Sequence, residues 1–75
     1  MNAAAEAERE ARRIALLLAR DGEAATREWV ERTLAIYRRA VLDPSHFASS
    51  HEYRARFLVS CACFRRWLAR KRITQ

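Results

Sequence analysis

The chain has 75 residues, a formal net charge of +6 and a hydrophobic content of 51%. We therefore expect one small domain, residues 1–75, with a thin core and little stability to spare. Two cysteines exclude the disulfide scaffold of tiny secreted domains, and the N-terminus lacks the basic and apolar regions of a secretory signal, so we expect a cytoplasmic protein with reduced thiols.

The charge is distributed unevenly along the chain. Residues 1–37 hold six arginines against seven acids, whereas residues 38–75 hold nine lysines and arginines against two acids. The positive field therefore belongs to the second half. This asymmetry favours an anionic partner, which is an acidic protein, a nucleic acid or a membrane surface.

The first predicted element is a helix from about Ala3 to Arg20. Good helix formers dominate, no segment alternates with a period of two, and the sequence as a whole predicts an all-α fold. Asp21-Gly22 is expected to end this helix, because glycine adopts a left-handed conformation at little cost. So short a link predicts an antiparallel helical hairpin. The apolar stripe of this helix is Ala7, Ala11, Ile14 and Leu18.

The second predicted helix runs from about Glu23 to Leu42. Two adjacent rows give it a wide apolar face. Asp43-Pro44 should end it, with Asp43 capping a short turn, and Ser49 with Glu52 reads as the capping box of the next helix. The first row is Trp29, Thr33, Ile36 and Ala40, and the second row is Val30, Leu34, Tyr37 and Val41.

The longest apolar run, Phe57–Phe64, is interrupted only by Ser60. It predicts the centre of a third helix, from about Ser50 to Arg72, on which the other two helices pack. The run is far shorter than the roughly 20 apolar residues that span a bilayer. The expected fold is thus a small three-helix bundle, an antiparallel hairpin closed by a longer third helix. The main buried face of the third helix is expected to be Tyr53, Phe57, Cys61, Phe64 and Leu68.

A second row on the third helix, Val59, Cys63 and Trp67, exceeds what a groove between two helices needs. Contiguous exposed apolar surface is rare on monomers, so this row is a candidate homodimer face. The alternative is a compact monomer that covers both rows.

The polar clusters do not predict chemistry. Cys61 and Cys63 are separated by about 200° around a helix, so their thiols diverge and cannot share a metal ion or bond each other. His46 and His51 lack further ligands, and helix capping accounts for Ser49 and Glu52. We therefore expect no metal site, no cofactor, no small-molecule substrate and no enzymatic activity.

Basic residues near the C-terminal end carry the strongest functional signal. Cations stabilise the C-terminal end of a helix dipole, and a solvated charged face is therefore one interpretation. An acidic protein partner is the preferred alternative, which makes the chain a non-enzymatic interaction module. A nucleic acid is the rival, although the link 43–49 is longer than the tight turn of a helix-turn-helix. The predicted partner-binding residues are Arg38, Arg39, Arg65, Arg66, Arg70, Lys71 and Arg72.

Overall fold

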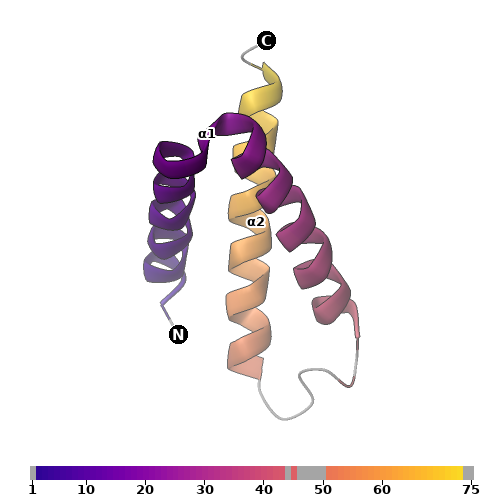
Figure 1. The fold of residues 1–75 in the computed structure, drawn as a ribbon. Helices are drawn as coiled ribbons and strands as arrows, with labels where there is room; N and C mark the ends of the chain where they lie inside the picture. The colour runs from indigo at the N-terminus through magenta and orange to yellow at the C-terminus, as the bar shows by residue number, and fades with distance from the viewer. Residues whose placement is uncertain (1, 44, 46–50, 74–75) are drawn as a thin grey trace.

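Two α-helices form nearly all of the described part of the chain. The computed structural model describes residues 2–43, 45 and 51–73, with side chains as far as Arg70. Helix α1 runs from Ala3 to Leu42, and helix α2 runs from His51 to Ile73. Figure 1 shows that α1 is sharply bent, and that α2 lies beside both of its halves. The molecule is a helical hairpin in which the first helix folds back on itself.

The bend in α1 is located at Gly22. This residue has φ 87° and ψ 174°, a backbone conformation that is essentially restricted to glycine. Helical geometry resumes at once, and the Thr26 hydroxyl donates a hydrogen bond of 2.7 Å to the carbonyl oxygen of Gly22. We call residues 3–21 the first arm of α1 and residues 23–42 its second arm.

The predicted three-helix bundle is wrong, although the described residues are all-helical as expected. The sequence predicted two helices, about Ala3–Arg20 and Glu23–Leu42, where the structure has the single helix α1. The physical reason is that Gly22 takes its positive φ without any loop beside it. It therefore bends the helix and does not end it.

Polar side chains form hydrogen bonds at both ends of α1. The Asn2 side chain accepts a hydrogen bond of 3.1 Å from the backbone N–H of Ala5. At the other end, Asp43 Oδ1 accepts from the N–H and the hydroxyl of Ser45, at 3.0 and 2.8 Å. The predicted capping box at Ser49 lies outside the described residues.

The core forms where the two arms of α1 meet the middle of α2. Phe64 is fully buried and its ring makes an edge-to-face contact with Trp29, with centroids 5.7 Å apart. The Tyr37 ring packs at a tilt against the Phe57 ring, with the two ring centroids 4.5 Å apart. The prediction that the apolar run of α2 carries the core is therefore confirmed. The buried core residues are Ile14, Val30, Leu34, Cys61 and Phe64.

Two large side chains that the sequence assigned to apolar faces are exposed. Tyr53 on α2 is 56% exposed and Ile36 on α1 is 60% exposed. A helical row is buried only where a neighbour covers it. Tyr53 lies in the first turn of α2, and Ile36 lies on a side of the second arm that neither the first arm nor α2 covers. Within the described residues, neither helix has a stretch long and apolar enough to cross a membrane.

Replacing Gly22 by Ala should lower the free energy of unfolding by about 1–3 kcal/mol, because an L-residue is strained at this φ and ψ. No atom of the described residues lies within 4 Å of where the added Cβ would be, so the expected cost comes from the backbone. Urea unfolding followed by circular dichroism measures it.

The matched control is a synthetic chain with D-alanine at position 22, which favours positive φ. It should be at least as stable as the natural chain. Equal destabilisation by both alanines would show that strain at Gly22 is not the cause.

Candidate functional site

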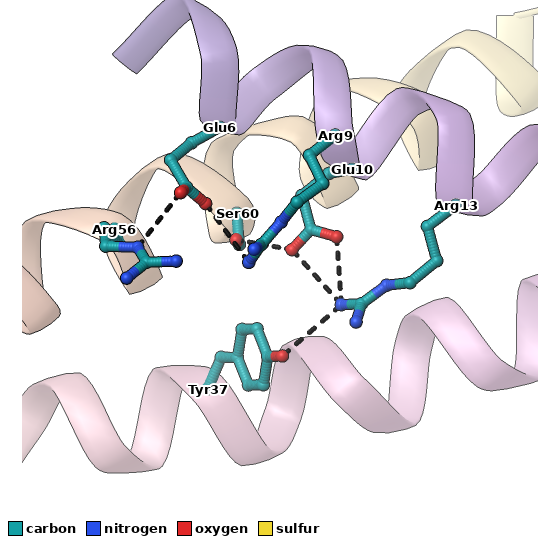
Figure 2. Close-up of polar contacts among 7 residues, drawn as sticks. All are labelled: Glu6, Arg9, Glu10, Arg13, Tyr37, Arg56 and Ser60. Atoms are coloured by element: carbon teal, nitrogen blue, oxygen red, sulfur yellow. Dashed lines mark hydrogen bonds and ion pairs between the residues drawn. The ribbon is translucent and has the colours of Figure 1, made fainter. Parts of the chain in front are cut away.

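A polar cluster connects both arms of α1 with α2. At its centre is Glu10 on the first arm, whose side chain is almost fully buried at 1% exposure. The Ser60 hydroxyl on α2 donates to Glu10 Oε2 at 2.5 Å, a length typical of a strong hydrogen bond to a carboxylate. Arg13 Nη2 lies 2.9 Å from Glu10 Oε1 and donates to Oε2 at 3.2 Å. Figure 2 shows these side chains converging from the two helices.

Arg13 extends the cluster to the second arm. Its Nη2 also lies 3.4 Å from the Tyr37 hydroxyl oxygen, to which it donates. The same guanidinium lies over the Trp29 ring, 4.9 Å from the ring centroid. One arginine thus compensates a buried carboxylate and contacts two aromatic side chains of the facing arm.

A second ion pair joins the start of the first arm to α2. Arg56 Nε donates to Glu6 Oε1 at 3.0 Å, and Arg9 approaches Glu6 Oε2 to 3.4 Å. The pairs Glu6–Arg56 and Glu10–Ser60 have the same sequence separation, so the first arm runs parallel to α2. Figure 2 shows both pairs side by side.

Sequence reasoning missed this cluster, although two signals pointed to it. Glu10 lies on the first arm at helical spacing from Ala7 and Ile14, inside an otherwise apolar stripe. Ser60 is the only polar residue in the run Phe57–Phe64. Glu10 and Ser60 each interrupt an apolar face, and the two side chains hydrogen-bond to each other.

Chemically, the cluster is suited to holding the arms together. The Ser60 hydroxyl donates a hydrogen bond to the Glu10 carboxylate, which also pairs with the Arg13 guanidinium. Both Ser60 and Glu10 are buried. Among the described residues, no group of histidine, cysteine and acidic side chains could hold a metal ion.

The arginines predicted to bind a partner are divided between two sides of α2. Arg38 and Arg65 line a cavity of about 240 Å³ between the second arm and α2. Arg66 and Arg70 line another cavity, of about 410 Å³, between the first arm and α2. Arg39 is exposed on α1 and lines neither cavity. The side chains of Lys71 and Arg72 lie outside the described part.

The cavity between the second arm and α2 combines charge with apolar surface. Leu42 is 76% exposed and Leu58 is 41% exposed, and both line it together with Val41. Cys61 also lines it, and burial raises the pKa of the Cys61 thiol, while the nearby cations Arg65 and Arg38 lower it by a smaller amount. We call this cavity the Arg38–Arg65 groove.

The candidate dimer face is half-buried within the chain. Cys63 and Trp67 line the 410 Å³ cavity opposite the first arm, and Trp67 packs against the core. Val59 is also half-buried. Self-association through this row stays a prediction.

Comparisons with known proteins give no match for this chain. No protein-family model matches it, and no curated protein or solved structure matches it either.

Replacing Ser60 by Ala should lower the free energy of unfolding by about 1.5–3 kcal/mol, because it removes a buried hydrogen bond to a carboxylate. Glu10→Ala should cost more, since it also leaves Arg13 without its partner. In a double-mutant cycle by urea unfolding, the two changes should couple by about 0.5–3 kcal/mol.

Ser45→Ala is the matched control, because it also removes a serine hydrogen bond to a carboxylate, but on an exposed pair that water can replace. It should change stability by no more than about 0.5 kcal/mol. Equal costs for Ser45→Ala and Ser60→Ala would contradict the central role of the cluster.

Both thiols should react slowly in the folded chain. Burial raises the pKa of Cys61 and of Cys63 above the ordinary value of 9.0, so the folded state holds less thiolate than the unfolded state at pH 8. Iodoacetamide labelling, with and without urea, measures the difference.

The same shift has a defined sign for stability. Since the folded pKa is raised, the thiol contribution is complete below the unfolded pKa of about 9 and is lost as the pH rises through the folded values. Labelling that is as fast in the folded chain as in urea would contradict both statements.

Proposed function

We propose that this chain is a small, non-enzymatic interaction module of the cytoplasm that binds an acidic protein partner through its basic surface. The observation that carries the proposal is the Arg38–Arg65 groove. Two exposed cations on different helices lie at one apolar groove, in which two leucines are exposed.

The charge pattern of the described residues supports a site for an anionic partner. The first-arm cations Arg9, Arg12, Arg13 and Arg20 each have an acidic neighbour within 4 Å. Among the described residues, Arg38 and Arg65 form no such ion pair. A carboxylate from a partner would therefore meet guanidiniums that are not already neutralised.

Apolar contact supports a protein as the partner. Leu42 and Leu58 offer an exposed apolar surface in the same groove as the two cations, and a protein segment with acidic and apolar residues matches both features. A nucleic acid would match the cations alone. The division of the arginines between two sides of α2 also gives phosphates no single continuous stripe to follow.

Reversing both charges, in the variant R38E/R65E, should weaken binding of the partner at least about tenfold, because like charges then face each other across the interface. Affinity purification with the tagged chain, quantified by mass spectrometry, measures partners retained by the natural chain. The matched control, R12E/R32E, makes the same change in charge at exposed positions away from the groove, and circular dichroism verifies that both variants fold.

The proposal fails if the R38E/R65E variant retains the same partners as the natural chain. A duplex DNA that shifts in a gel at low salt, with a log affinity that falls steeply against log salt, would favour the nucleic-acid alternative instead.

A further inference from the structure

The cavity between the first arm and α2, which we call the alanine groove, is larger than the Arg38–Arg65 groove. Its volume is about 410 Å³, against about 240 Å³. The first arm presents Ala7, Ala11 and Ala15 along it, and these short side chains leave the space between the helices unfilled. Opposite them, Trp67 forms part of the wall.

The walls of the alanine groove are apolar, but its lining also includes two cations. Arg66 and Arg70 are exposed and lie one turn apart on α2, where two like charges repel each other. None of the described residues that line the groove is acidic, and neither arginine forms an ion pair with a described residue. An anion between the two guanidiniums would relieve that repulsion.

The size of the groove limits its occupant. A volume of about 410 Å³ lies in the lower part of the range of small-molecule sites, about 300–1,000 Å³. An apolar body with one anionic end matches both the alanine-lined walls and the arginine pair.

We propose that the alanine groove binds a single-chain amphipathic carboxylate, such as a free fatty acid. The hydrocarbon chain lies along Ala7, Ala11 and Ala15 against Trp67, and the carboxylate accepts hydrogen bonds from Arg66 and Arg70. Each methylene removed from water adds to affinity, and the arginine pair selects the anionic head. This site is separate from the proposed protein-binding groove and does not depend on it.

The test is isothermal titration calorimetry of the full chain with sodium dodecanoate, kept below its micelle-forming concentration. We expect one dodecanoate bound per chain. The variant A11L/A15L fills the groove with larger side chains and should abolish binding without a change in charge. The variant R66Q/R70Q keeps the groove and should weaken binding at least about tenfold.

Two control variants match these changes. A25L/A35L adds the same side chains at exposed positions on the second arm, and R12Q/R32Q removes the same two charges from other surface positions. Both should bind dodecanoate like the natural chain, and circular dichroism verifies the fold of every variant.

Four outcomes would overturn the proposal. They are no binding of monomeric dodecanoate, equal binding of dodecyltrimethylammonium, equal losses in the test and control variants, and binding only to phospholipid vesicles. Loss of dodecanoate binding in R66Q/R70Q with retention in R38E/R65E would show that the two grooves act separately.

Discussion

The buried contact between Glu10, Ser60 and Arg13 is the interaction on which the rest of this structure depends. A carboxylate buried away from water needs hydrogen-bond donors or a cation to offset the loss of its hydration. For Glu10, the Ser60 hydroxyl from α2 and the Arg13 guanidinium from the first arm supply these contacts. A shift of the first arm by one turn along α2 would separate Glu10 from Ser60. Leaving the buried carboxylate without this hydrogen bond would cost about 1.5–3 kcal/mol, a large part of the stability of a small domain. The contact therefore fixes the register of the first arm.

The same contact determines which surfaces reach solvent. Because Glu6 and Glu10 hold the first arm parallel to α2, its alanine side lies opposite Trp67, and the alanine groove forms there. The second arm, held from the other side by aromatic contacts of Trp29 and Tyr37, brings Arg38 next to Arg65. Both candidate binding sites are consequences of how the two arms and α2 pack against one another.

A bent helix achieves this arrangement with very little chain. Gly22 alone reverses the direction of α1, and Thr26 satisfies its carbonyl oxygen immediately afterwards. In a domain of 75 residues, a tight reversal leaves more of the chain available for packing. Because the buried apolar core is small, we expect the polar contacts between the helices to supply a large share of the stability.

The sequence by itself determined the local structure. Helical spacing and composition predicted helices throughout, the single glycine marked the reversal, and the apolar run of α2 predicted Cys61 and Phe64 in the core. The tertiary structure decided what depends on neighbours. It made Gly22 a bend within one helix, left Tyr53 and Ile36 exposed, paired Glu10 with Ser60, and divided the arginines between two grooves. Helical periodicity specifies which residues share a face, because it is a property of one segment. Which face is covered, and by which partner, is a property of three segments together, and only their packing determines it.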